Sequence, residues 1–266
     1  MRSILDGRPY RHFTTALILS VALAATACQS KTASLGSLDT MSTASTAKPS
    51  FTATAALGKK WQADPSNIDI GLAYANGLEA LGQTDRQMQV LKTLSGNHPE
   101  NSQLQSLYGK KLLAAGRTGD AIAVLEGTAA SANANIDWRL LSALGSAYDQ
   151  QGRYAEARTQ YGKALQLAPD DVTVLNNMGM SYALEGDLKQ AETTLRQASM
   201  LPKAAAEPRI RQNLALVVGL QGRFDEARKI ASEDLPPDQV EANMAYLQKM
   251  LSQPNTWQQL SGETQG

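Results

Sequence analysis

Apolar residues recur at helical spacing in the middle of the chain, and short polar turns interrupt them. The segment 138–171 is the clearest example, because its first half places four large residues on one side of a helix: Trp138, Leu141, Leu144 and Tyr148. A turn containing Gly152 follows, and a second helical pattern then runs until Pro169 ends it. The pattern predicts two helices joined by a short turn.

The same pattern recurs along the chain, with one glycine in each turn. These glycines follow one another at steps of 34 or 36 residues: Gly82, Gly116, Gly152, Gly186 and Gly222. Repeating units of this size predict an array in which each unit buries its apolar face against the next. The predicted array covers 61–236, with units near 68–101, 102–137, 138–171, 172–207 and 208–237.

The repeat resembles the tetratricopeptide repeat, and the match covers roughly 68–236. A small residue recurs in the first helix of three units: Gly109, Gly145 and Gly179. An alanine recurs in the second helix of four: Ala121, Ala157, Ala191 and Ala227. We expect these positions to let the two helices approach closely, and larger residues such as Tyr161 and Leu195 to fill the space to the next unit. The resemblance implies an all-α, right-handed helical solenoid of about five repeats.

A final amphipathic helix is predicted over 237–253. Its apolar residues form one stripe and its other face is polar, as a helix that caps the last repeat requires. Asp238 is the predicted N-cap, with Glu241 completing a capping box. Residues 254–266 are predicted to be a loose tail.

The N-terminus has the pattern of a secretory signal peptide, predicted over 1–27. Three arginines precede the apolar segment 13–27, which is short for a permanent membrane span. The following Ala25-Thr26-Ala27-Cys28 resembles the lipobox of bacterial lipoproteins, although Ala25 stands where leucine is usual. Cleavage after Ala27 would make Cys28 the first residue and the site of a lipid anchor. The same residues also suit an ordinary signal peptidase, which would leave a soluble periplasmic protein.

Serine, threonine and alanine dominate the segment that follows Cys28. The interpretation of 28–60 is a flexible tether, because so few large apolar residues cannot offset the entropy of ordering. A partly helical, alanine-rich segment is the alternative.

Composition and motifs argue against nucleic-acid binding and catalysis. Lys+Arg and Asp+Glu are balanced at 25 each, so no charge excess favours nucleic acid. The sequence contains no Gly-rich phosphate loop, no zinc-protease motif and no nucleophile elbow. Removal of 1–27 would leave one histidine and one cysteine, too few for a Cys/His site within one chain. We expect no enzyme activity, no cofactor and no metal.

The geometry of the family places the first helix of each unit along a concave groove that binds partner peptides. Eight residues on these helices are the candidate groove residues: Asn76, Lys110, Arg139, Asn176, Asn177, Met180, Arg209 and Asn213. Asn177 and Asn213 are equivalent, at positions where related repeats often bind a peptide backbone; the alternative is that they brace the neighbouring repeat. Arg139 and Arg209 could meet a carboxylate. Met180 fits packing better than recognition.

The run RIRQNLALVVGLQGRFDEARKIASEDLPPDQVEANMAYLQKML at 209–251 goes beyond the generic repeat. Together with the lipobox and the repeat number, it resembles the tetratricopeptide lipoproteins of Flp/Tad (tight adherence) pilus assembly, the TadD type. That resemblance implies an outer-membrane lipoprotein that faces the periplasm and helps the pilus secretin to assemble or localise. The alternative is a general cell-envelope adaptor for another complex.

Overall fold

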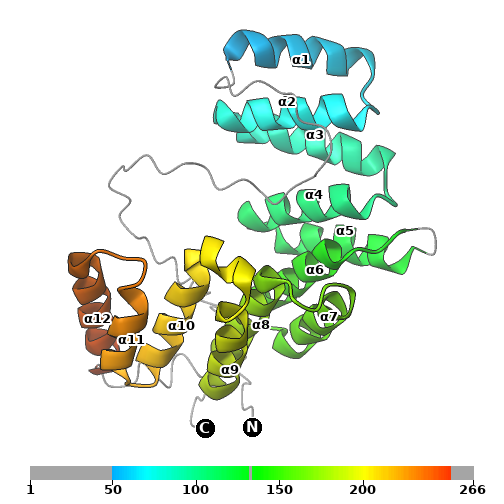
Figure 1. The fold of residues 1–266 in the computed structure, drawn as a ribbon. Coiled ribbons are helices and arrows are strands. Elements are labelled where there is room, and N and C mark those ends of the chain that lie inside the picture. The colour runs from blue at the N-terminus through cyan, green and yellow to red at the C-terminus, as the bar shows by residue number, and fades with distance from the viewer. Residues whose placement is uncertain (1–49, 132–133, 253–266) are drawn as a thin grey trace, which may run out of the picture. The chain divides into compact units, whose positions relative to one another are not determined.

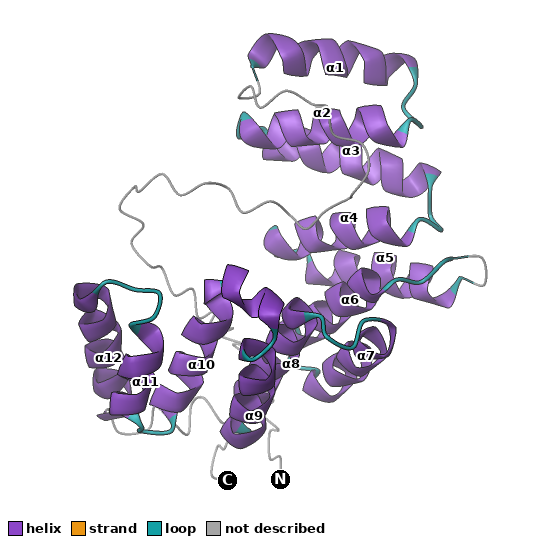
Figure 2. Cartoon of the chain, in the orientation of Figure 1, coloured by secondary structure: helices purple, strands orange, loops and turns teal. Residues whose placement is uncertain are grey.

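The computed structural model describes residues 50–131 and 134–252, and these ranges contain helices and no strand (Figure 2). The all-α prediction is therefore confirmed for this part of the chain. The predicted signal peptide, Cys28, most of the tether and the tail 254–266 lie outside the described residues.

Twelve α-helices and one short 3-10 helix follow one another along the described chain (Figure 1). Each α-helix contacts the next one in sequence. Their bounds are α1 Phe51–Ala63, α2 Ile68–Ala80, α3 Thr84–Asn97, α4 Ser102–Ala114, α5 Thr118–Ala130, α6 Trp138–Gln150, α7 Tyr154–Leu167, α8 Val172–Glu185, α9 Leu188–Ser199, η1 Pro202–Ala206, α10 Pro208–Leu220, α11 Phe224–Ala231 and α12 Pro237–Ser252. The pairs from α2/α3 to α10/α11 fall within the five predicted units. The first member of each pair is called helix A below, and the second helix B.

The turn between helices A and B is built in the same way in all five pairs. Gly152 has a φ of 73°, in the left-handed region that glycine adopts without steric cost. The next amide, that of Arg153, donates to the carbonyl of Tyr148 at 2.9 Å and closes the end of α6. The other four turn glycines also have positive φ: Gly82, Gly116, Gly186 and Gly222. The regular glycine steps in the sequence therefore mark one repeated backbone device.

The helices of a pair pack a glycine of helix A against a large side chain of helix B. A Cβ at Gly145 would lie 2.6 Å from the Tyr161 ring, and one at Gly179 would lie 2.7 Å from Leu195. This contact lies within one repeat, so it adds to the predicted packing of Tyr161 and Leu195 toward the next unit and does not test it. Both lie over the glycine of their own repeat, because that glycine leaves the room that a side chain would occupy.

Helix α1 corrects the predicted extent of the tether, because residues 51–60 are helical. The Ser50 hydroxyl caps the helix by accepting from the Ala53 amide at 3.1 Å. Gly58 is buried against the ring of Tyr74, and the Trp61 and Tyr74 ring centroids lie 5.9 Å apart. Small residues allow α1 to approach α2 closely, so the segment packs without many large apolar side chains.

Helix α12 covers the end of the last repeat, as a capping helix does. Leu247 of α12 is buried against Gly219 of α10. A Cβ added to Gly219 would lie 2.8 Å from the Cδ1 atom of Leu247. The predicted capping box is wrong. The helix begins at Pro237, whose fixed φ suits a first turn, and the Pro236 carbonyl accepts from the Val240 amide at 3.1 Å. Glu241 instead accepts from Arg228 of α11 at 2.7 Å.

Candidate functional site

The candidate groove residues lie on the A helices, and four of these helices are neighbours in space. Helix α4 contacts α6, α6 contacts α8, and α8 contacts α10. We call the side chains that these helices and α2 present at the candidate positions the A-helix surface. Asn76 is exposed on α2, and no hydrogen bond within the described residues links it to the other seven. The structure groups the remaining seven on α4, α6, α8 and α10.

Three asparagines connect successive A helices through their side-chain amides. Asn213 of α10 donates to the Oδ1 atom of Asn176 on α8 at 2.8 Å. Asn176 then donates to Asn177 at 3.4 Å, and Asn177 donates to the Ser142 hydroxyl of α6 at 3.5 Å. The short bond shows that Asn213 braces the neighbouring repeat. The two longer bonds exceed the usual range for N–H···O contacts, so Asn177 retains capacity to bind another partner.

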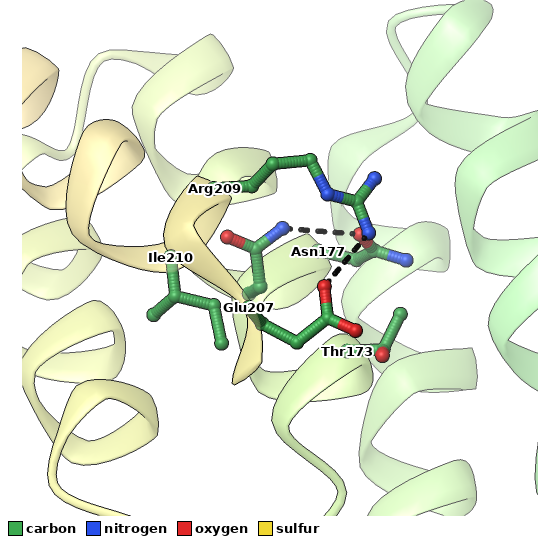
Figure 3. Close-up of a pocket in the computed structure, with 6 residues that line it drawn as sticks. Thr173, Asn177, Glu207, Arg209 and Ile210 are labelled. Atoms are coloured by element: carbon green, nitrogen blue, oxygen red, sulfur yellow. Dashed lines mark hydrogen bonds and ion pairs between the residues drawn. The ribbon is translucent and has the colours of Figure 1, made fainter. Parts of the chain in front are cut away.

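A small pocket lies between the N-terminal ends of α8 and α10 (Figure 3). Its lining residues are Thr173, Asn176, Asn177, Glu207, Arg209 and Ile210. In Figure 3 the Arg209 side chain reaches from α10 toward Asn177, and its only marked bond is to Glu207, at 3.3 Å. Arg209 is 74% exposed in that position. The pocket therefore combines amide, hydroxyl, guanidinium and carboxylate groups, which can bind the N–H and C=O groups of a peptide backbone.

Arg139 and Lys110 add positive charge on α6 and α4. The Arg139 guanidinium lies over the Trp138 ring, 4.6 Å from its centroid, and its nearest carboxylate is that of Asp137, at 3.7 Å. Surrounding protein atoms lower the pKa of Lys110, and the charge of Arg139 lowers it further. The Lys110 side chain is nevertheless exposed to solvent. Both cations are thus available on the A-helix surface.

Met180 is partly buried against the apolar cluster that includes Leu195 and Leu214, which agrees with a packing role. Two leucines that share the helical phase of Met180 were not predicted as part of this surface. Leu184 of α8 is 50% exposed, and the equivalent Leu220 of α10 is partly exposed. The signal was present in the sequence, because Leu184 and Leu220 are separated by the same step as the turn glycines that follow them.

Asp149 has a structural role in joining two repeats. One carboxylate oxygen accepts from the Ser181 hydroxyl of α8 at 2.6 Å, and the other accepts from the Tyr161 hydroxyl of α7 at 2.8 Å. Burial raises the pKa of Asp149, and the two hydrogen bonds oppose that rise. Each carboxylate oxygen accepts one hydrogen bond within the fold, so Asp149 contributes to the alignment of α6 and α8.

A charged cluster joins the fourth and fifth repeats on the side of helices B. Glu192 of α9 accepts from Arg223 at 2.7 Å and from the Gln221 amide at 2.8 Å. Arg196 of α9 also pairs with Glu226 of α11. The bonds to Arg223, above all, lower the pKa of Glu192 to about 2. This cluster holds the two repeats together away from the A-helix surface.

No group of three or more His, Cys, Asp or Glu side chains in 50–131 and 134–252 is arranged to hold a metal ion. Over the same ranges, every helix is too short or too polar to span a bilayer.

Two tetratricopeptide family profiles match the chain, one described as a TPR repeat at 145–186 and one as a tetratricopeptide repeat at 172–203. The TPR repeat-containing protein PA4667 of Pseudomonas aeruginosa is 33% identical over 132 residues, which are 49% of this chain and 22% of that protein. The uncharacterized protein y4yS of Sinorhizobium fredii is 31% identical over 121 residues, which are 46% of this chain and 64% of that protein. The chain therefore spans less than two thirds of either relative.

Solved structures share the fold at low sequence identity. PilW, titled a widely conserved type IV pilus biogenesis factor, matches with a TM-score of 0.58 and 18% identity over 76% of this chain and 90% of its own. TTC0263 of Thermus thermophilus, titled a thermophilic TPR protein, matches with a TM-score of 0.55 and 23% identity over 67% of this chain and 97% of its own. YrrB, titled a TPR protein with an unusual peptide-binding site, matches with a TM-score of 0.50 and 14% identity over 74% and 99%. The chain contains tetratricopeptide repeats and folds as a tetratricopeptide solenoid, an architecture of protein-interaction scaffolds.

Proposed function

We propose that this tetratricopeptide solenoid is a scaffold that holds segments of partner proteins on its A-helix surface during assembly of an Flp (Tad) pilus. The observation that carries the binding role is the pocket between α8 and α10. There both hydrogen bonds that Asn177 makes with other described residues are long, at 3.4 and 3.5 Å, and Arg209 is largely exposed. A peptide in extended form can supply the main-chain donors and acceptors that these groups lack.

The pilus role is supported by the sequence of 209–251, which resembles the corresponding sequence of Flp/Tad lipoproteins of the TadD type. PilW, titled a type IV pilus biogenesis factor, has a similar fold, so this architecture also occurs in a protein of pilus biogenesis. We infer that the partner is the pilus secretin or another assembly component, and that the scaffold aids secretin assembly or localisation.

The proposed location is the periplasmic face of the outer membrane, with a lipid anchor at Cys28. This part of the proposal rests on the sequence, because Cys28 lies outside the described residues. Gln29 follows the cysteine, and a residue other than Asp at that place is compatible with sorting to the outer membrane.

In-cell photo-crosslinking from Asn177 tests the binding role. A photoreactive residue there should capture the secretin or another pilus component, while the same residue at Lys163, exposed on helix α7, should not. Equal capture from both positions would show that α8 is not the binding surface.

Deletion of the gene separates the pilus role from that of a general adaptor. Loss of Flp pili and of assembled secretin, restored by the intact gene, is the expected result. Normal pili together with a defect in another envelope complex would favour the general adaptor and contradict the pilus assignment.

A further inference from the structure

Four apolar side chains form a patch on the A helices of the last two repeats. Each helix carries two of them, four residues apart and so on one side of the helix: Met180 and Leu184 on α8, and Leu216 and Leu220 on α10. Leu184 is 50% exposed, and the other three are partly buried. Because α8 contacts α10 and the two pairs are separated by one 36-residue step, the pairs lie beside each other. We call these four residues the apolar patch.

The apolar patch is confined to the fourth and fifth repeats. The three repeats before them carry polar or small residues at the same two positions: Ser146 and Gln150 in the third, Lys110 and Ala114 in the second, and Asn76 and Ala80 in the first. An occupant that ran along the whole array through apolar contacts would need them in every repeat. The patch therefore suits an occupant that is present at this end of the array.

The segment that follows α12 begins beside the apolar patch. Helix α12 contacts both α10 and α11 at the end of the array (Figure 1). Its Leu247 lies against Gly219, the residue before Leu220. From Leu247 the helix runs five more residues to Ser252, about 7.5 Å at 1.5 Å per residue. Residues 253–266, which lie outside the described ranges, thus start close to Leu220.

Two large apolar residues of this segment, Trp257 and Leu260, lie within reach of the patch. A chain spans at most about 3.3–3.6 Å per residue, so Trp257 can lie up to about 17 Å from Ser252 and Leu260 up to about 27 Å. Packed helices are about 8–10 Å apart, which places Leu220 and Leu184 inside these limits. Glu263 is the one charged residue in 253–266, so little charge opposes contact with an apolar surface.

An occupant from the same chain also suits the small size of the patch. A segment joined to its site by a short linker has an effective concentration on the order of a millimolar, so contacts too weak to hold a separate partner are sufficient. A stable interface with a second copy takes about 20–30 residues a side. Four side chains, three of them already partly buried, are far fewer.

We propose that the segment 253–266 folds back over the apolar patch, with Trp257 and Leu260 covering Leu184 and Leu220. This assigns a position to the tail that the repeat pattern predicts to be loose. The patch shares α8 and α10 with the pocket of Asn177, so the segment competes with a partner for this part of the A-helix surface. That consequence deepens the proposed function and rests on it, whereas the contact itself requires no partner.

The fluorescence of Trp257 in the full chain tests the contact. Trp61→Phe with Trp138→Phe leaves Trp257 as the one tryptophan, and its emission maximum and its quenching by acrylamide report its exposure. Trp257 should emit at a shorter wavelength and be quenched less than in the same chain unfolded in urea. Leu184→Glu together with Leu220→Glu should shift both values toward those in urea.

A leucine of matched exposure provides the control. Leu167 on helix B α7 is 55% exposed, so Leu167→Glu introduces the same charge on another surface and should leave the emission of Trp257 unchanged. Circular dichroism checks that each variant is folded. Emission of Trp257 as in urea while both leucines are intact, or an equal shift in Leu167→Glu, would overturn the proposal. Emission that depends on protein concentration would assign the contact to a second copy and overturn it too.

A second measurement keeps all other tryptophans in place. Trp257→Ser with Leu260→Ser should uncover the patch, so the fluorescence of added bis-ANS, a dye that binds exposed apolar surface, should rise above that with the unsubstituted chain. Adding Leu184→Glu and Leu220→Glu should remove the increase, and an unchanged dye signal in the serine variant would contradict the contact. Failure of crosslinking at Asn177 would remove the scaffold role and leave this contact standing, so the two proposals fail separately.

Discussion

Gly145 of α6 packs directly against the ring of Tyr161 of α7 in the third repeat. A Cβ on Gly145 would lie 2.6 Å from the Cε1 atom of Tyr161, a distance that real Cβ atoms do not reach. Tyr161 is 1% exposed, and its hydroxyl donates to Asp149 at 2.8 Å. The ring is held at both ends, so it cannot move aside for a larger residue at 145.

Gly145→Leu should therefore destabilise the solenoid strongly. Ordinary overpacking costs about 1–3 kcal/mol, and we expect more here because Tyr161 would lose both its packing and its hydrogen bond. Urea unfolding followed by circular dichroism measures the change. The control is Gly162→Ala on α7, where an added Cβ would meet no atom within 4 Å. That change should stabilise by about 0.5–1 kcal/mol, because alanine favours the helix. An unchanged midpoint for Gly145→Leu would contradict the packing described for this repeat.

Gly152→Ala should cost stability through the backbone alone. An added Cβ would meet no atom within 4 Å, so packing is unaffected, but φ at this residue is 73°. An L-residue in the left-handed region costs roughly 1–2 kcal/mol. Urea unfolding compares the stability of Gly152→Ala with that of Gly162→Ala. Both substitutions add one methyl group in open space, so the difference between them reports the backbone cost at Gly152. Similar stabilities for the two variants would mean that the turn has another conformation in solution.

The fold could be predicted from the sequence because one spacing pattern repeats. The turn glycines and the apolar phase are local signals, and each unit gives the same signal again. A flexible tether was preferred over the partly helical alternative at α1 because the contacts of this helix are made by small residues, Thr54 and Gly58, which carry almost no hydropathy signal. The packing of these small residues beside Trp61 and Tyr74 becomes apparent only in the three-dimensional structure.

The candidate site could be predicted only in part, because hydrogen-bond partners are not visible in a pattern. The sequence placed Asn177 and Asn213 in equivalent positions, yet Asn213 has a short bond to Asn176 and Asn177 does not. Likewise Arg139 and Arg209 each stand two positions after an acidic residue in the sequence. The difference between Asp137 and Glu207 depends on which acidic side chain caps its helix, and this requires coordinates.

Acid should weaken the junction between the fourth and fifth repeats through Glu192. Its pKa is lowered from 4.5 to about 2, with the Arg223 bonds as the main cause. A carboxyl group with a lowered folded-state pKa stabilises the fold fully above its unfolded pKa, and this contribution is lost as pH falls from about 4.5 toward 2. We expect a contribution of about 1–3 kcal/mol, reduced by the partial exposure of Arg223.

Urea unfolding at a series of pH values measures this contribution. Glu192→Gln should lower stability at neutral pH and flatten the dependence between pH values of about 4.5 and 2. Asp170→Asn changes an exposed carboxylate in the turn after α7. It should leave the stability at neutral pH and its dependence on pH nearly unchanged. The same slope in Glu192→Gln as in the unsubstituted chain would assign the acid sensitivity to other groups.

Cys28→Ser should release the protein from the membrane fraction into the periplasm. A single acyl chain binds a bilayer only marginally, at about 0.8 kcal/mol for each buried CH₂, whereas a lipidated N-terminal cysteine that carries several chains is held firmly. Serine cannot form the thioether, so the anchor is lost while the repeats are untouched. Thr26→Ser, a conservative change two positions earlier, is the control and should stay in the membrane fraction. Mass spectrometry of the N-terminal peptide gives an independent reading. A membrane-bound Cys28→Ser variant, or an unmodified Cys28 in the unsubstituted protein, would rule out the lipid anchor and favour cleavage by the ordinary signal peptidase.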